Sequence, residues 1–343
     1  MNAKTTLMRE EILSIPDVTA KFLDASRATL AAAGAKLREK NPPFLASIAR
    51  GSSDHVSAFL KYSSELTAGI PVASLGPSVA SIYGVKLKLG SAATLSISQS
   101  GKSPDIVSMT NAARESGALT IAITNVIASD LAHASDFAID ILAGPERSVA
   151  ATKSFVSSAV AGLALIGHWT QDNKLLAAID DLPAALAKAV ACDWSAFAGA
   201  VTDENSLFVL GRGPSLAIAN EMALKFKETS AVHAEAFSAA EVMHGPKAIV
   251  GEGFPILVLA ARDAAEDSLV DAANRLADQG AAVFLTSSKP SHATALPFVP
   301  TSHPLTDPLA LLVSFYAFVE SFARSRGLNP DEPPHLRKVT ETL

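Results

Sequence analysis

Apolar runs of strand length alternate with stretches of helical periodicity along most of the chain. The run that begins at Pro43 continues through a Gly-containing turn into a helical stretch, and the run that begins at Ser206 does the same. Further strand-like runs lie at residues 92–101, 118–125, 254–263 and 281–288. Strands that alternate with helices are typical of parallel sheets covered by helices on their faces.

The two halves of the chain repeat the same spacing, which indicates an internal duplication. Gly51 and Gly101 are 50 positions apart, and the corresponding Gly211 and Ala261 are also 50 positions apart. We therefore predict an α/β protein with two tandem doubly wound parallel-sheet domains of the flavodoxin-like type.

Four segments are expected along the chain. They are an N-terminal helical arm (1–34), a first domain (35–190), a second domain (191–328) and a C-terminal tail (329–343). The stretch from Asp172 to Val190 is predicted to join the two domains as a helix and linker. Because a polar, Pro-rich tail usually frays, an ordered tail requires contacts that hold it.

Composition narrows the class of protein. The 343 residues are 49% apolar, and 28 basic against 34 acidic residues give a net charge of −6 without a basic cluster, so nucleic acid is not an expected partner. The single cysteine, Cys192, and the lack of Cys/His spacing favour a reducing compartment and no metal. The charged N-terminus and the short apolar run at 159–169 indicate no signal peptide and no membrane span. A cytoplasmic protein is expected.

The stretch "SISQSGKSPD" (96–105) follows a predicted strand and opens a predicted helix. Ser103 suits the N-cap, Pro104 the first helical position, and Gly117 the helix end. Ser98, Gln99 and Ser100 are then expected at the strand end, facing a helix N-terminus that favours phosphate.

From this stretch alone, two interpretations are open: a phosphate site, or a Ser103 that caps its own helix while the other hydroxyls face water. The equivalent turn of the second half, "AARDAAED" (260–267), has no run of hydroxyls, so the fold does not require one. The first half is therefore the better candidate. Ser52 and Ser53, beside Gly51, are expected at the same ligand.

A polar helical face is predicted in "EMALKFKE" (221–228). Glu221, Lys225 and Glu228 fall at positions i, i+4 and i+7, beside an apolar stripe. The residues alone favour a solvated ladder of ion pairs. The G-x-G of "LGRGPS" (210–215) lacks the third glycine of a dinucleotide site, so no cofactor is expected.

Four motifs in order carry a resemblance to a known family: "SISQSGKSPD", "AGPERSVAATKSF" (143–155), "EMALKFKETSAVHAEAFSAAEVMHGP" (221–246) and "LRKVTE" (336–341). Together they resemble the sugar isomerase (SIS) superfamily, and more narrowly the isomerase half of glucosamine-6-phosphate synthase. The resemblance covers nearly the whole chain and implies a hexosamine or hexose 6-phosphate as substrate.

The resemblance implies roles for individual residues. Glu228 matches the acid/base glutamate, His244 the ring-opening histidine, and Lys338 a lysine that forms an imine or assists ring opening. Glu146 and Ala150 are implied at the sugar pocket. The family's histidine comes from a neighbouring subunit, so a homodimer with shared sites is expected.

Other interpretations of these residues stay open. His244 also suits a plain turn, and His233 is an alternative histidine that is expected to pack or cap. Glu146 is also consistent with an ordinary acidic residue of a loop, and Lys338 is also consistent with a mobile charge on the surface.

Three departures from the synthase pattern refine the expected activity. Asn2 follows Met1 where the synthase has a catalytic cysteine, so glutamine is not the expected nitrogen source. "SGKSPD" is closer to stand-alone glucosamine-6-phosphate deaminases, and Ala151 replaces a family serine. The expected reaction converts glucosamine 6-phosphate to fructose 6-phosphate and ammonia.

Several alternatives to this reaction remain. They are a galactosamine-6-phosphate deaminase, a fructosamine-phosphate deglycase, an ammonia-dependent synthase and a sugar-phosphate sensor without turnover. Sensors of this kind usually carry a helix-turn-helix, for which the short N-terminal arm with Pro16 leaves little room.

Overall fold

The computed structural model describes residues 5–202 and 204–338, and these residues form two compact units. Within the described residues, the first-sheet unit comprises 17–146 and 153–180, and the second-sheet unit comprises 5–16, 147–152 and 181–338. Each unit combines segments that are distant in the sequence. The four segment boundaries expected from the sequence therefore stay a prediction.

The first-sheet unit contains a five-stranded sheet with the order β2-β1-β3-β4-β5, in which every pairing is parallel. The strands are β1 (Leu45–Ile48), β2 (Val72–Leu75), β3 (Ala93–Ser98), β4 (Leu119–Thr124) and β5 (Phe137–Asp140). The helices are α2 (Ile15–Lys40), α3 (Ser52–Thr67), α4 (Ser78–Ser81), α5 (Pro104–Glu115), α6 (Asp130–His133), α7 (Lys153–Thr170) and α8 (Asn173–Ala189). Two of the boundaries between the units fall inside α2 and α8.

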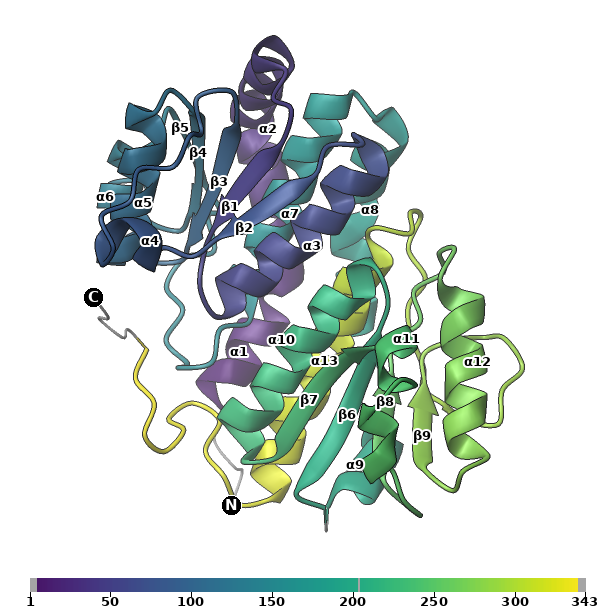
Figure 1. Cartoon of the computed structure of the whole chain (residues 1–343). Helices are drawn as coiled ribbons and strands as arrows, with labels where there is room; N and C mark the ends of the chain where they lie inside the picture. The colour runs from purple at the N-terminus through teal and green to yellow at the C-terminus, as the bar shows by residue number, and fades with distance from the viewer. Residues whose placement is uncertain (1–4, 203, 339–343) are drawn as a thin grey trace. The chain divides into compact units, whose positions relative to one another are not determined.

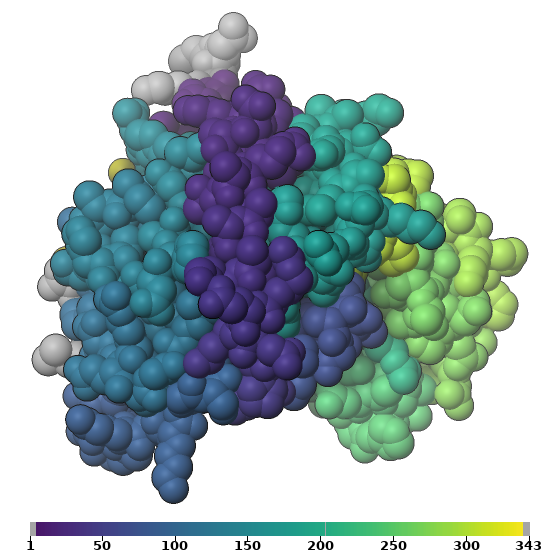
Figure 2. Space-filling model, turned by 90° about the horizontal axis from the view of Figure 1, so that it is seen from above, coloured from purple at the N-terminus to yellow at the C-terminus, as the bar shows by residue number. Residues whose placement is uncertain are grey.

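Helices cover both faces of this sheet (Figure 1). α3 and α7 pack on each other and on the sheet, whereas α5 packs on the sheet together with α4 and α6. Figure 2 shows α2, in purple, along the surface of the unit. Arg27 of α2 pairs there with Asp180 of α8 at 3.1 Å.

The second-sheet unit repeats the same topology, with the order β10-β9-β8-β6-β7 and parallel pairings throughout. The strands are β6 (Ser206–Gly211), β7 (His233–Ser238), β8 (Pro255–Val258), β9 (Ala282–Leu285) and β10 (Thr294–Ala295). The helices are α1 (Leu7–Leu13), α9 (Ser195–Val201), α10 (Pro214–Ser230), α11 (Ala239–Val242), a 3₁₀ turn (Pro246–Ile249), α12 (Glu266–Ala277) and α13 (Asp307–Ser325).

Counted from the first strand of each unit, both sheets have the strand order 2-1-3-4-5, which is the flavodoxin-like order. The predicted fold class, two tandem doubly wound α/β domains, is therefore confirmed. The sequence analysis did not identify the strands β2, β5, β7 and β10.

A nearly fully buried helix lies in the core of each unit. In α7, every residue except His168 and Thr170 is buried. In the second-sheet unit, α13 is buried over most of its length. The apolar run at 159–169 thus belongs to a core helix. Among the described residues, no helix combines the length and apolarity that crossing a lipid bilayer requires.

The Pro-rich tail is held inside the second-sheet unit by Asp331. The two carboxylate oxygens of Asp331 accept the backbone N–H groups of Leu7 and Met8, each at 2.8 Å, at the start of α1. The backbone carbonyl of Asp331 accepts the N–H of Val149 at 3.1 Å. These bonds hold the described part of the tail, residues 329–338, against α1 and the loop 147–152. The rest of the predicted tail, 339–343, lies outside the described residues.

Replacing Asp331 by alanine removes the acceptors of two N–H groups at the start of α1. We expect Asp331→Ala to lower the free energy of unfolding by about 1–2 kcal/mol, as the loss of a helix cap does. Hydrogen exchange at Leu7 and Met8 should accelerate, and urea unfolding measures the stability. The neighbouring Glu332→Ala removes the same charge from an exposed position and serves as the control. Equal effects of both substitutions would refute the role of Asp331.

Candidate active site

The predicted phosphate turn lies at the carboxyl end of β3 and begins with a buried serine. The Ser98 hydroxyl accepts the N–H of Gly101 at 3.2 Å, and the Ser100 hydroxyl accepts the N–H of Lys102 at 3.3 Å. Gly101 has φ +63°, and a Cβ atom at this position would collide with the side chain of Ser129. The turn therefore requires glycine and draws its hydroxyls close to the backbone.

The helix after this turn starts and ends as the sequence predicts. Ser103 is the N-cap, Pro104 is the first residue of α5, and the helix ends before Gly117, which has φ +93°. In the described chain, the Ser103 hydroxyl makes no capping bond to α5. Ser103 thus occupies the N-cap position, as predicted, without a side-chain cap bond. The first N–H groups of α5 remain a suitable environment for an anion.

The other predicted phosphate residues lie at neighbouring positions of the same sheet edge. Ser52 and Ser53 open α3, directly after β1, and Gly51 before them has φ +54°. β1 and β3 are adjacent parallel strands, so their carboxyl ends meet at one edge. Gln99 follows β3, and its backbone carbonyl accepts the N–H of Asn125 at 3.1 Å. The structure thus gathers the turns after β1 and β3 at one edge of the first sheet.

Glu146 braces the start of α7. Its Oε1 accepts the backbone N–H of Ser154 at 3.0 Å, and its Oε2 accepts the Ser154 hydroxyl at 2.6 Å. The side chain is buried, and Lys153 donates to the Pro145 carbonyl nearby at 2.6 Å. This geometry gives Glu146 a helix-capping function in the first-sheet unit.

The loop 147–152, which carries Ala150, belongs to the second-sheet unit. Glu11 of α1 accepts the backbone N–H groups of Arg147 and Ser148. The Lys338 ammonium donates to the Ser148 carbonyl at 2.8 Å. Ala150 is buried. The structure therefore brings Lys338 and the loop that contains Ala150 together, and the alternative interpretation of Lys338 as a mobile surface charge is wrong.

The polar face of α10 is buried, which the sequence analysis did not anticipate. Lys225 lies between two carboxylates, with its Nζ 3.1 Å from Glu221 Oε1 and 2.5 Å from Glu228 Oε2. The side chains of Glu221 and Lys225 are 0% exposed, whereas that of Glu228 is 23% exposed. The favoured interpretation of a solvated ion-pair ladder is therefore wrong.

The charge of Lys225 is stabilised by its two neighbours. Burial by itself lowers the pKa of a lysine, but the carboxylates of Glu221 and Glu228 outweigh this effect and raise the pKa of Lys225 above its usual value. The Tyr316 hydroxyl of α13 donates to Glu221 Oε1 at 3.2 Å. Tyr316 is a member of this cluster that the sequence analysis missed, because no local pattern connects α13 with α10.

The two candidate histidines, His244 and His233, both lie at exposed positions. His244 follows α11, and its backbone N–H donates to the Glu241 carbonyl at 2.9 Å. Within the described residues of this single chain, the His244 ring is not hydrogen-bonded to Glu228. His233 opens β7 and is exposed, so the interpretation of His233 as a packed residue is wrong.

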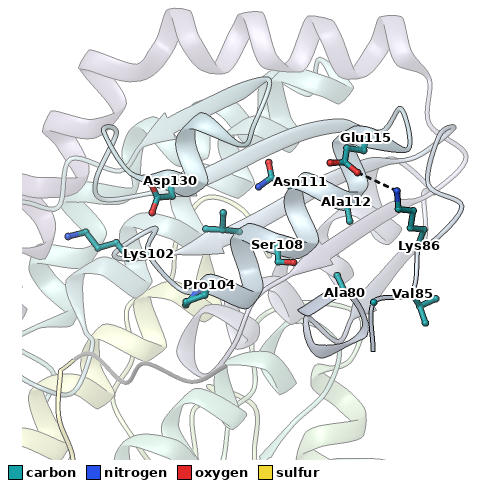
Figure 3. A pocket seen from close by; sticks show the side chains of 12 residues that line it. Ala80, Val85, Lys86, Lys102, Pro104, Ser108, Asn111, Ala112, Glu115 and Asp130 are labelled. Atoms are coloured by element: carbon teal, nitrogen blue, oxygen red, sulfur yellow. Dashed lines mark ion pairs between the residues drawn. The ribbon is translucent and has the colours of Figure 1, made fainter. Parts of the chain in front are cut away.

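A cavity of about 580 Å³ lies along the outer face of α5 (Figure 3). Lys102 and Pro104 from the phosphate turn contribute to its lining, and Lys86 pairs with Glu115 across it at 3.8 Å. Ser98, Gln99, Ser100 and Ser103 do not line it. The cavity thus lies next to the predicted phosphate turn and not at its hydroxyl groups.

Comparisons with known proteins identify the family of the chain. The chain matches the SIS domain family over residues 45–167 and 200–299. It is 28% identical to a glutamine–fructose-6-phosphate aminotransferase (isomerizing) of Symbiobacterium thermophilum over 96% of this chain and 56% of that protein. The chain thus spans about half the length of the curated relatives that it matches.

Two solved structures are also similar. A candidate phosphosugar isomerase from Silicibacter pomeroyi DSS-3 is 54% identical, with a TM-score of 0.93, and the match covers 95% of this chain and 100% of that one. A glucosamine-6-phosphate deaminase from Thermotoga maritima has a TM-score of 0.75 at 20% identity, with 98% and 100% of the chains covered, and shares the fold. The resemblance seen in the four sequence motifs is confirmed, and the chain belongs to the SIS domain family.

Proposed function

We propose that the protein is an amino-sugar phosphate isomerase and deaminase that converts glucosamine 6-phosphate and water to fructose 6-phosphate and ammonia. The observation that carries this proposal is the carboxylate of Glu228, which Lys225 holds at 2.5 Å while 23% of its side chain stays exposed. A fixed carboxylate that reaches solvent is suited to moving a proton on a bound substrate.

The phosphate group is assigned to the first-sheet unit. The turn from Ser98 to Ser103 offers hydroxyls, backbone N–H groups and the N-terminus of α5, and Ser52 and Ser53 open α3 beside it. Such a combination binds phosphate through hydrogen bonds and through the positive end of the helix dipole.

Proton transfer is assigned to Glu228. In the open-chain aldehyde, its carboxylate takes the proton from C2 while the aldehyde oxygen gains a proton, which gives an enolamine. The carboxylic acid then returns the proton to C1 while the amine nitrogen releases one. The product is an imine at C2. Water adds to the imine carbon, and ammonia leaves as the ketose forms. Lys225 keeps Glu228 in place during both transfers, because its ammonium is itself fixed by the buried Glu221.

Ring opening is assigned to His244 and Lys338. An imidazole near neutrality can move a proton at the ring oxygen. The Lys338 ammonium is held against the loop 147–152, so it is an ordered group that can assist at C1. His244 is exposed in the single chain, and we propose that a second subunit completes the site in a homodimer with shared sites.

A substrate panel tests the reaction directly. Hexosamine 6-phosphates and fructosamine phosphates are offered to the protein, and released amine and ketose phosphate are measured. We expect release of both from glucosamine 6-phosphate. If only another member of the panel releases amine, that sugar and not glucosamine 6-phosphate is the substrate. If ligands stabilise the protein without any release, the protein is a sugar-phosphate sensor and not an enzyme.

Glu228→Gln keeps the shape of the side chain and removes the base. We expect turnover to fall by at least about 100-fold, while stabilisation of the protein by fructose 6-phosphate persists. Glu235→Gln, at an exposed position of β7, makes the same exchange and should leave turnover unchanged. Equal turnover of both variants and the parent would remove Glu228 from the mechanism.

Lys225→Met leaves Glu221 buried with its charge uncompensated. We expect the free energy of unfolding to fall by about 3–5 kcal/mol at neutral pH. The difference in the free energy of unfolding between the variant and the parent should shrink toward pH 5. At that pH, protonation of the buried Glu221 in the variant removes its charge from the folded state. Urea unfolding at several pH values measures both effects.

The matched control for this substitution is Arg275→Met on α12. Arg275 lies 3.7 Å from Asp271 in an i, i+4 pair whose side chains are 62% and 70% exposed. We expect a loss of at most about 0.5 kcal/mol there. A similarly small loss for Lys225→Met would show that the α10 cluster is not the buried pairing described above.

A further inference from the structure

A second ion pair lies at the carboxyl edge of the first sheet, outside the residues discussed so far. Arg50 follows β1, and Asp105 lies in the first turn of α5. The Arg50 Nε donates to Asp105 Oδ2 at 2.6 Å, and a terminal guanidinium nitrogen pairs with the same oxygen. The Asp105 side chain is 3% exposed, whereas that of Arg50 is 39% exposed. The pair combines a buried acid with a cation that reaches solvent.

The position of this pair in the sheet is informative. In the order β2-β1-β3-β4-β5, the direction of the chain order reverses between β1 and β3, and open α/β sheets bind ligands at this switch point. The register pairs Ile48 of β1 with Ser96 of β3. Arg50 comes two residues after Ile48, just beyond the end of β1, and Ser98 comes two residues after Ser96 at the end of β3. Arg50 therefore lies beside the phosphate turn.

The charge of Arg50 matters at the N-terminus of α5, because Asp105 lies there. A carboxylate in the first turn of α5 interacts well with the helix dipole, but it repels a phosphate that binds at the same helix end. The Arg50 guanidinium neutralises Asp105. In addition, Asp105 Oδ1 is buried and accepts no hydrogen bond from the described residues. A buried carboxylate oxygen normally has a donor, which points to a donor that arrives with a ligand, such as a protonated phosphate oxygen or a bound water.

We propose that Arg50 is a phosphate-binding residue of this site and that Asp105 holds its guanidinium in the orientation for binding. Arginine suits the task because its planar fork stays charged and binds two oxygens of a phosphate at once. This inference rests on the phosphate turn of the proposed function and adds a cation to it. The competing explanation is purely structural: the pair fastens α5 to the end of β1.

Inorganic phosphate is the probe that separates these explanations. The full chain is titrated with phosphate at constant ionic strength, and binding is followed by calorimetry and by the shift in melting temperature relative to each variant's own value. We expect Arg50→Gln to weaken phosphate binding at least about tenfold, which is the effect of losing one charge-assisted hydrogen bond. Asp105→Asn should weaken it as well, because the guanidinium loses its charged anchor.

The matched control is Arg114→Gln in the last turn of the same helix. Arg114 pairs with Asp136 at 3.2 Å, so the substitution removes the same charge and an ion pair at the opposite end of α5. Phosphate affinity should not change there. Parent affinity in Arg50→Gln, or a parent that does not bind phosphate, would overturn the proposal. If Arg50→Gln does not fold, Arg50→Lys decides, because a lysine keeps the charge and loses the fork, and we expect weaker binding.

The outcome for this residue is separate from the outcome for the reaction. Phosphate binding that depends on Arg50, without amine release from any sugar of the panel, supports this inference and rejects the proposed reaction. Turnover of glucosamine 6-phosphate with unchanged phosphate affinity in Arg50→Gln supports the reaction and rejects this inference.

Discussion

A fully buried ammonium group constrains the second-sheet unit. Lys225 has no exposed surface, so Glu221 and Glu228 must replace the water that its charge loses on folding. The helix α10 supplies both carboxylates, and α13 supplies the Tyr316 hydroxyl that binds Glu221. The packing of α10 on α13 is thereby tied to a polar cluster that tolerates little displacement. Glu228 gains its fixed position from this arrangement, since the group that holds it is itself immobilised.

Much of the fold was predictable because buried strands carry a strong local signal. β3 is buried at all six positions, and its sequence is apolar or small throughout. The missed strands lack this signal. β2 and β7, at the sheet edges, have few buried residues, and β10 has two exposed residues. Edge strands pack on one side only, so their composition does not differ enough from that of loops and helices.

The candidate site was predictable only as far as local spacing reaches. The turn from Ser98 to Ser103 was visible because an N-cap, a proline and a run of hydroxyls occur together. The burial of Lys225 was not visible, since Tyr316 lies 95 positions from Glu221. The anchoring of the tail likewise depends on Asp331 and Leu7, which are 324 positions apart. Periodicity places a residue on a face of a helix, but the element that covers this face comes from the tertiary structure.

The two sheets share a topology, but the turns at their carboxyl ends differ in how many polar groups are hydrogen-bonded within the protein. After β8, Arg262 directs its guanidinium to Asp307 at 2.9 and 3.1 Å, and the N–H of Thr301 donates to the same carboxylate at 2.8 Å. The polar groups of that turn are bound within the unit.

After β3, by contrast, the Ser103 hydroxyl makes no capping bond to α5 within the described residues. One carboxylate oxygen of Asp105 accepts no hydrogen bond from any described residue. A duplicated fold therefore does not duplicate a site. The capacity to bind an anion depends on which polar groups the protein leaves for a ligand, and the strand order alone does not determine it.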